Sequence, residues 1–264
     1  MSQRPRPASG LRDPAREAHL CAILAGAALG RPVYAYASAD STMALAHELA
    51  ARGEPEGTLV WALRQTQGRG RLGRAWASPE GGAYFSLILR PSRDAVETPQ
   101  IALVAGLSVA EAIRDAAGLY PSIRWPNDLL LGGKKLSGIL VESKDDAVVV
   151  GVGINVTTDV ADLPPHATSL AAAGAARCGV ADLIGGCCRR MSGWYARWQR
   201  EGFAPIREAL RPWVGLFGRP VQIDAGRARF QGVANDVDET GRLVVRLDSG
   251  ILRSFEAGDV TLLR

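Results

Sequence analysis

The sequence has few cysteines and no long apolar run. Both features exclude classes of protein structure. None of its four cysteines, at positions 21, 178, 187 and 188, forms a C-x-x-C pair. A disulfide framework and a zinc site are therefore not expected. Gly, Arg or Asp interrupts the longest apolar stretches before about 18 residues, so no membrane-spanning helix is predicted. No apolar region with a clean cleavage site follows the Arg/Pro-rich N-terminus, so we expect a cytoplasmic protein.

Net charge is also low. The 264 residues carry a net charge of +4, with 22% charged and 47% apolar residues. These values are typical of a globular chain with one large domain, or with a large and a small one. A general nucleic-acid binder would concentrate more positive charge on one face. Much of the Arg excess lies at the extreme N-terminus and in residues 69–74, which indicates a local anion site.

Apolar periodicity and turn signals predict a mixed α+β domain. Residues 1–18 look like a flexible arm, and a short apolar segment continues to about Gly30. The clearest helix covers residues 99–117, with Thr98 as N-cap and Gly118 at its end. Gly132-Gly133 predicts a hairpin turn. The other predicted elements are strands 33–37, 59–63, 83–89, 122–125, 129–131, 136–142 and 147–156, a helix from Thr42 to Gly53, and a helical segment 181–211.

The pattern changes around residues 212–218. Short strands separated by Gly and Asp follow, at 220–223, 229–235, 243–247, 251–255 and 260–263, and they predict a small SH3-like β-barrel. We therefore divide the chain into an N-terminal arm with a short helix (1–30), a main domain (31–212) and a C-terminal barrel (213–264). The main domain is expected to be an α+β fold with a mixed, largely antiparallel sheet flanked by helices.

The segment Gly68–Arg74 alternates glycine with arginine. Its glycines let the backbone approach a ligand, and its arginines offer forked donors for phosphate or carboxylate. The spacing does not match a P-loop or a Rossmann fingerprint. An RGG-like nucleic-acid segment is the alternative. The loop is short and bounded by strand-like residues, which favours a small-molecule site.

Three further clusters have ordinary structural explanations when each is taken alone. Ser41-Thr42 before an apolar helix is a normal N-cap signature. Lys135 opens a strand and would usually be solvated, although the hairpin should bring it back towards Asn127. The stretch Gly151–Asn155 looks like a buried strand that ends in a turn residue.

The order of these clusters resembles the biotin–protein ligases. The motifs are S-T at Ser41, a Q-T-x-G-R-G-R-x-G-R-x-W-x-S loop from Gln65 to Ser78, W-P-N-D from Trp125, K-L-x-G-I-L-V-E from Lys135 and G-x-G-I-N from Gly151. The resemblance covers residues 33–155 with specific motifs and continues more weakly through the C-terminal barrel. It implies a class II synthetase-like catalytic domain that uses ATP and Mg²⁺ to convert biotin to biotinyl-5′-AMP. The acyl group would then pass to a lysine of a biotin carrier domain.

The resemblance also implies roles for individual residues. Lys135 and Arg71 would be catalytic, because fixed cations stabilise the charge that develops at the α-phosphate. Residues expected to contact biotin are Ser41, Thr42, Met43, Gln65, Gly68, Arg69, Gly70, Arg71, Lys135 and Gly138. Residues expected near the nucleotide are Arg69, Arg71, Arg74, Trp76, Asn127, Lys135 and Asn155. No protein ligand of Mg²⁺ is assigned.

Some positions depart from the family pattern. Arg124 stands where a Lys is common, Met43 where an Asn is common, and Gln67 where a small residue is usual. The segment before Val33 is short and rich in Pro and Ala, so we expect a ligase without a DNA-binding domain or DNA partner. No membrane partner is expected, and a homodimer is compatible with the family. A lipoate or octanoate ligase on the same scaffold is the closest alternative, and a nucleic-acid-binding module is a more distant one.

Overall fold

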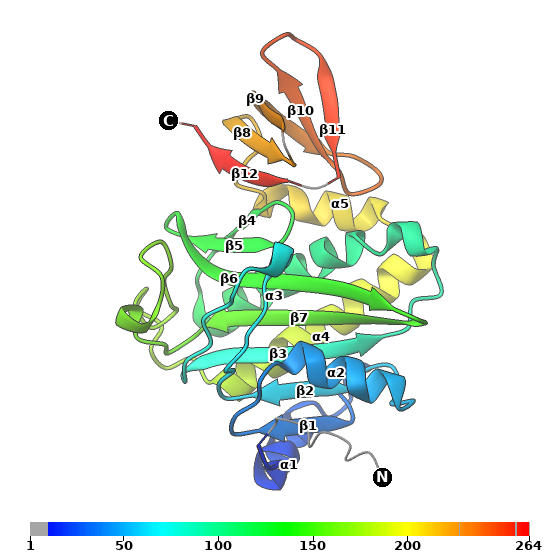
Figure 1. Ribbon diagram of the computed structural model, residues 1–264, viewed down its shortest axis with the longest axis vertical. Helices are drawn as coiled ribbons and strands as arrows, with labels where there is room; N and C mark the ends of the chain where they lie inside the picture. The colour runs from blue at the N-terminus through cyan, green and yellow to red at the C-terminus, as the bar shows by residue number, and fades with distance from the viewer. Residues whose placement is uncertain (1–9, 227, 257, 264) are drawn as a thin grey trace, which may run out of the picture.

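A seven-stranded mixed sheet forms the centre of the larger part of the protein (Figure 1). The computed structural model describes residues 10–226, 228–256 and 258–263. The strand order is β1-β2-β3-β7-β6-β5-β4, with β1 and β2 parallel and every other neighbouring pair antiparallel. The strands are β1 (Val33–Tyr36), β2 (Leu59–Ala62), β3 (Gly82–Leu89), β4 (Ser122–Arg124), β5 (Asp128–Leu131), β6 (Lys134–Lys144) and β7 (Ala147–Asn155). The predicted mixed, largely antiparallel sheet is confirmed.

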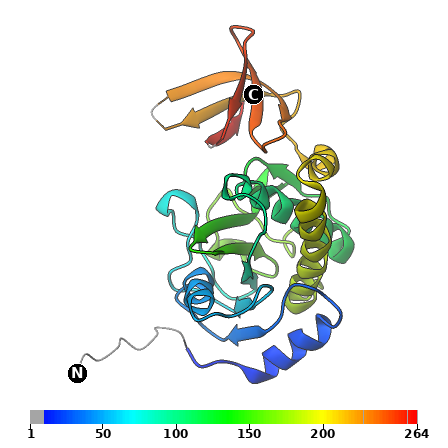
Figure 2. The same ribbon diagram turned by 90° about the vertical axis from the view of Figure 1, so that its right-hand side faces the viewer.

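Helices cover both faces of this sheet (Figure 2). Helix α2 (Thr42–Ala51) packs on one face, and helices α3 (Gln100–Ala117) and α4 (Val180–Glu201) pack on the other. Successive side chains of a strand point to opposite faces. On β2, Val60 therefore joins the core under α2, whereas Trp61 joins the core under α3 and α4. Both faces are buried, which explains why the central strands are continuously apolar in sequence.

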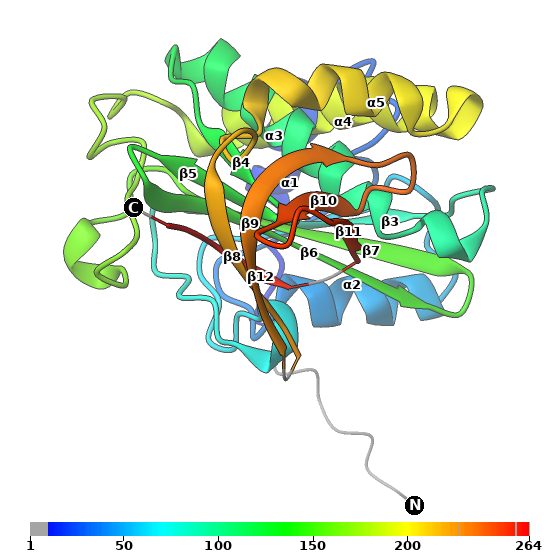
Figure 3. The same cartoon turned by 90° about the horizontal axis from the view of Figure 1, so that it is seen from above.

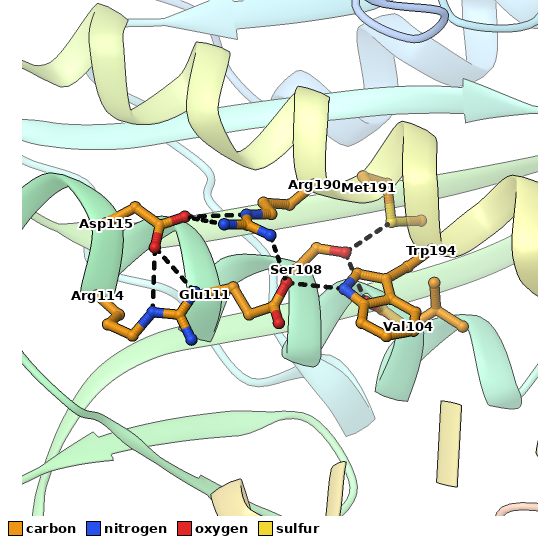
Figure 4. A network of polar contacts seen from close by, with 8 residues as sticks. All are labelled: Val104, Ser108, Glu111, Arg114, Asp115, Arg190, Met191 and Trp194. Atoms are coloured by element: carbon orange, nitrogen blue, oxygen red, sulfur yellow. Dashed lines mark hydrogen bonds and ion pairs between the residues drawn. The ribbon is translucent and has the colours of Figure 1, made fainter. Parts of the chain in front are cut away.

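A set of polar contacts fastens α3 to α4 (Figure 4). Arg190 Nε donates to Asp115 Oδ2 over 2.9 Å, and Trp194 Nε1 donates to Glu111 Oε2 over 2.8 Å. Nearby, the buried Ser108 Oγ donates to the carbonyl oxygen of Val104 at 2.8 Å. The helical layer is thus tied together on the face of the sheet opposite α2.

Three predicted boundaries are wrong. Helix α1 (Pro14–Ile23) lies partly inside the predicted flexible arm, because the Asp13 side chain caps it and Pro14 starts it. Residues 1–9 of that arm lie outside the described residues. Pro99, not Thr98, occupies the cap position of α3, without a side-chain hydrogen bond. The predicted segment 181–211 is two helices, α4 and α5 (Ala204–Leu210), because Gly202 adopts φ +75° between them.

A second, five-stranded antiparallel sheet forms the C-terminal part, beyond the β4 edge of the central sheet (Figures 1 and 3). Its order is β11-β10-β9-β8-β12, as expected for a small all-β domain. Its strands are β8 (Pro220–Ala225), β9 (Ala228–Val237), β10 (Leu243–Leu247), β11 (Leu252–Phe255) and β12 (Asp259–Leu262). Asp236 holds it to α5 and the turn that follows, through ion pairs with Arg207 at 2.6 Å and Arg211 at 3.0 Å. Trp125 Nε1 also donates to the carbonyl oxygen of Gly241 at 3.0 Å.

No helix within the described ranges is both long enough and apolar enough to span a bilayer.

Candidate active site

A pocket of about 620 Å³ opens between the central sheet, the Gly/Arg loop and strand β12. The loop crosses in front of β6 (Figure 1). The predicted site residues that line the pocket are Thr42, Met43, Gln65, Arg69, Gly70, Arg71, Arg74, Trp76, Asn127, Lys135, Gly138 and Asn155. The fold thus brings together motifs that are far apart in the sequence.

Two predicted residues, Ser41 and Gly68, do not line the pocket. Ser41 is buried as the N-cap of α2, where its side chain accepts a long hydrogen bond from Ala44 N at 3.5 Å. A Cβ at Gly68 would lie 2.5 Å from the carbonyl oxygen of Trp76 and 2.6 Å from Ser78 Oγ. The structure therefore supports the capping interpretation of Ser41, and it assigns Gly68 to loop packing.

The Gly/Arg loop is a folded flap rather than a flexible RGG-like segment. Backbone hydrogen bonds join its two sides, from Gln65 N to Ser78 O (3.1 Å), from Trp76 N to Gly68 O (2.9 Å) and from Gly70 N to Arg74 O (2.7 Å). A 3₁₀ turn at Arg71–Gly73 forms the tip. We call residues 65–70 and 74–78 the stem of the loop.

Each arginine of the loop contacts a different part of the protein. Arg69 Nη2 lies 3.3 Å from Glu142 Oε2 on β6, and that oxygen also lies 2.9 Å from His47 Nε2. Arg71 Nη1 donates to Asn127 Oδ1 over 3.0 Å.

Arg74 forms an ion pair with Asp259 of β12. The loop is thereby joined to β6, to the turn before β5 and to the C-terminal sheet. Asp259 is a pocket residue that the sequence analysis missed, and no motif indicates it.

Lys135 is held in the pocket rather than solvated. Its Nζ lies 2.7 Å from Asp128 Oδ1, and Arg124 Nη2 lies 2.6 Å from the other oxygen of the same carboxylate. The ammonium also lies 5.2 Å from the centre of the Trp76 ring. The hairpin does return Lys135 to the W-P-N-D turn, but its partner is Asp128 rather than Asn127. Asp128 ends the W-P-N-D motif and Arg124 directly precedes it, although neither was assigned a role.

Glycines form the floor of the pocket. Gly138 of β6 pairs with Gly153 of β7, and the Trp76 ring lies directly on both. A Cβ at Gly138 would lie 2.9 Å from Trp76 Cζ3, and one at Gly153 would lie 2.4 Å from Trp76 Nε1. Met43 covers Gly151 in the same way, with Sδ 2.5 Å from the position of a Cβ. The missing side chains let flat or apolar groups approach the sheet closely.

Thr42 and Gln65 form a polar end of the pocket. Gln65 Oε1 accepts hydrogen bonds from Thr42 N at 2.8 Å and from Thr42 Oγ1 at 3.1 Å. The buried Ser86 Oγ donates to Thr42 Oγ1 over 2.9 Å, and Gln65 Nε2 donates to Ser78 Oγ over 2.9 Å. Ser78 ends the loop motif but was assigned no role, and Ser86 lies outside every motif. They lie behind the pocket rather than among its lining residues.

The cysteines take no part in this site. Burial raises the pKa of Cys188 to about 12 and the pKa of Cys187 well above its usual value. Neither residue lines the pocket. Because the thiolate is the reactive form, these side chains behave as core residues.

Two family models match this chain. The Biotin/lipoate A/B protein ligase family matches residues 35–159, and the Biotin protein ligase C terminal domain matches residues 216–263. A biotin–[acetyl-CoA-carboxylase] ligase of Mycobacterium tuberculosis is 33% identical over 265 residues, which cover 96% of this chain and 98% of the relative. The chain belongs to the biotin protein ligase family. It is accordingly an enzyme of the ATP-dependent ligase class.

Further members of the biotin protein ligase family are similar to this chain in sequence and in structure. A bifunctional ligase/repressor of Bacillus subtilis is 37% identical over 228 residues, which cover 83% of this chain and 70% of the relative. Among solved structures, the biotin protein ligase from Aquifex aeolicus in complex with biotin and ATP has a TM-score of 0.78 and 30% identity. That match covers 89% of this chain and 99% of the solved one.

We predict that Gly153→Ala displaces the Trp76 ring, because the added methyl group would overlap Nε1. The overlap should cost about 1–3 kcal/mol of stability, as overpacking usually does. The measurement is the tryptophan emission spectrum of Trp76, obtained by subtracting the spectrum of the matching Trp76→Phe variant. This spectrum should shift to the red as the ring becomes exposed.

Gly193→Ala is the matched control, because a Cβ there meets open space on helix α4. It should leave the Trp76 spectrum unchanged. An unshifted spectrum in the Gly153→Ala variant would show that the ring does not depend on the glycine floor.

Proposed function

We propose that this protein activates biotin with ATP to form biotinyl-5′-AMP and pyrophosphate, and then transfers biotin to a lysine of a carrier domain. The observation that carries the proposal is the composition of one pocket. It combines a glycine floor, a polar end at Thr42 and Gln65, and cationic side chains at Arg71 and Lys135. The related Aquifex enzyme was solved with biotin and ATP, and the M. tuberculosis relative is named for a carboxylase acceptor.

Biotin has an apolar bicyclic body and a polar ureido group, and this pocket suits both. The apolar side of Met43 and the glycine floor would take the body. Thr42 and Gln65 would bind the ureido edge. Small-molecule sites commonly use such an apolar lining with a few well-placed polar groups.

The first reaction step joins the biotin carboxylate to the α-phosphate of ATP and releases pyrophosphate. Negative charge gathers on the phosphoryl oxygens as the new P–O bond forms. Lys135 and Arg71 would stabilise that charge from fixed positions, which lowers the barrier more than it strengthens substrate binding. Asp128, whose other oxygen pairs with Arg124, holds the Lys135 ammonium in place before the substrates arrive.

Mg²⁺ would enter as part of the MgATP substrate complex. The pocket carboxylates Asp128 and Asp259 already pair with Lys135, Arg124 and Arg74. No group of three or more His, Cys, Asp or Glu side chains in the described part of the chain could hold a metal ion. The nucleotide phosphates would therefore supply most of its ligands.

The second step transfers biotin from the mixed anhydride. A neutral lysine amine of the carrier attacks the acyl carbon, and AMP leaves with the electrons of the broken C–O bond. Water would hydrolyse the same anhydride, so the Gly/Arg loop has to shield it until the carrier arrives. The carrier, the cytoplasmic location and a homodimer remain predictions.

A lipoate or octanoate ligase is the closest alternative, since one matching family model covers biotin and lipoate ligases together. The match of residues 216–263 to the biotin protein ligase C-terminal domain favours biotin. The deciding experiment incubates the protein with MgATP, a biotin carrier domain and either biotin or lipoate, and measures the mass of the carrier. We expect the mass of one biotinyl group, that is biotin less one water, to be added. Modification by lipoate alone would overturn the proposal.

We predict that Lys135→Ala lowers the rate of biotinyl-AMP formation by about 100- to 1000-fold, as expected when a fixed transition-state donor is removed. Single-turnover formation of biotinyl-AMP is the measurement, and thermal unfolding reports on the fold. Lys134→Ala is the matched control, because Lys134 is exposed on the same strand and does not line the pocket. A normal rate in the Lys135→Ala variant would remove Lys135 from the mechanism.

We predict that Arg71→Ala speeds the release of biotin and of biotinyl-AMP by about tenfold or more, because a charge-assisted contact is lost. Arg71→Lys should release both ligands at rates between those of the wild type and of Arg71→Ala, since lysine keeps the charge but not the forked geometry. Stopped-flow displacement measures both rates. Arg64→Ala, an exposed arginine just before the loop, should release both ligands like the wild type. Unchanged release from the Arg71→Ala variant would argue against loop retention.

A further inference from the structure

We infer that Ser78 is a positioning residue that orients the Gln65 amide for the ureido group of biotin. This inference rests on the proposed function, and it concerns a residue that does not line the pocket itself. Ser78 lies on the returning side of the loop stem and is 6% exposed. It therefore links recognition of the ligand to the folded state of the stem.

A hydrogen-bond chain of fixed direction carries this inference. At one end the backbone N–H of Thr42 donates to Gln65 Oε1 over 2.8 Å. In the middle Gln65 Nε2 donates to Ser78 Oγ over 2.9 Å. At the other end Ser78 Oγ donates to the carbonyl oxygen of Trp76 over 3.1 Å.

The two ends of the chain are backbone groups that cannot exchange roles. A backbone N–H only donates and a backbone carbonyl only accepts. Ser78 has a single hydroxyl hydrogen, and the Trp76 carbonyl takes it. Ser78 must therefore accept from Gln65, so the amide nitrogen faces Ser78 and the amide oxygen faces Thr42.

This orientation determines what Gln65 offers to a ligand. Its oxygen already receives two hydrogen bonds from Thr42. Its nitrogen donates one of its two N–H groups to Ser78. The second N–H has no protein partner among the described residues, so it is available to a ligand in the pocket. Gln65 thus presents a donor, which suits the strongly accepting carbonyl oxygen of a ureido group.

The packing around Ser78 explains why the chain depends on a closed stem. Ser78 O accepts the backbone N–H of Gln65 at 3.1 Å, so the two residues are joined twice. Gly68 leaves the space that Ser78 Oγ and the Trp76 carbonyl occupy. Opening the stem would separate Ser78 from Gln65 and free the amide to rotate.

The experiment compares Ser78→Ala with wild type in biotin-dependent pyrophosphate exchange. We expect KM for biotin to rise about tenfold, the usual effect of losing one well-placed hydrogen bond. KM for ATP should stay within about twofold of the wild-type value. Ser78→Cys keeps a small side chain whose S–H group forms only weak hydrogen bonds, so it should also raise KM for biotin and serves as the second variant if Ser78→Ala folds poorly.

A double-mutant cycle separates positioning from general structural damage. In a Gln65→Ala background, Ser78→Ala should add almost nothing to KM for biotin, because Ser78 acts through Gln65. Ser108→Ala removes another buried serine that donates to a backbone carbonyl, far from the pocket, and should leave both KM values unchanged.

Several results would overturn the inference. These are an unchanged KM for biotin in both Ser78 variants, an equal rise in KM for ATP, or a full additional rise in the Gln65→Ala background. Failure of the proposed function looks different, because the wild-type protein itself would then show no pyrophosphate exchange with biotin.

Discussion

The close approach of the Trp76 ring to the central sheet is the constraint on which the site depends. Two neighbouring strands lack side chains at paired positions, Gly138 and Gly153, and the indole rests in the resulting space. The ring also sits beneath the Lys135 ammonium. A larger residue at either glycine would lift the returning side of the loop from the sheet. This contact therefore anchors the part of the loop that carries Arg69 and Arg74 in the stem and Arg71 at the tip.

A second constraint is the compensation of charge inside the pocket. Arg124 and Lys135 share the Asp128 carboxylate, and Arg69 meets Glu142. Such pairs hold cationic groups in a partly buried site, where an unpaired charge would be costly. The arrangement lets the protein keep fixed positive charge beside the place where phosphates would bind. At position 124 the arginine keeps this pairing through a single contact, from Nη2 to Asp128 Oδ2 at 2.6 Å.

Much of the fold was predictable because its signals are local. The Gly132-Gly133 turn, the helix after Ser41 and the short C-terminal strands all carry composition that favours one conformation. The boundary errors arose where local signals compete. Asp13-Pro14 is a helix start inside an Arg/Pro-rich arm, and Gly202 ends a helix in an otherwise continuous apolar pattern.

Most of the predicted site residues line one pocket, and they were predictable because they belong to motifs that can be recognised in the sequence. Contacts between distant segments were not predictable. Asp259 forms an ion pair with Arg74 because β12 lies next to the loop in the folded protein. No spacing in the sequence indicates that pair. Ser78 and Ser86 lie behind the pocket, and although Ser78 ends the loop motif, nothing in the sequence indicates its hydrogen bond with Gln65. Ser41 is a motif position whose side chain caps helix α2 in the structure, and its predicted contact with biotin stays a prediction.

The place of β12 has a consequence for how the enzyme is made. Residues 258–261 form part of the pocket wall, although they follow the loop by more than 180 positions in the chain. A ribosome would therefore have synthesised the loop, the glycine floor and Lys135 well before the wall is complete. The pocket therefore lacks this part of its wall until the second sheet has folded.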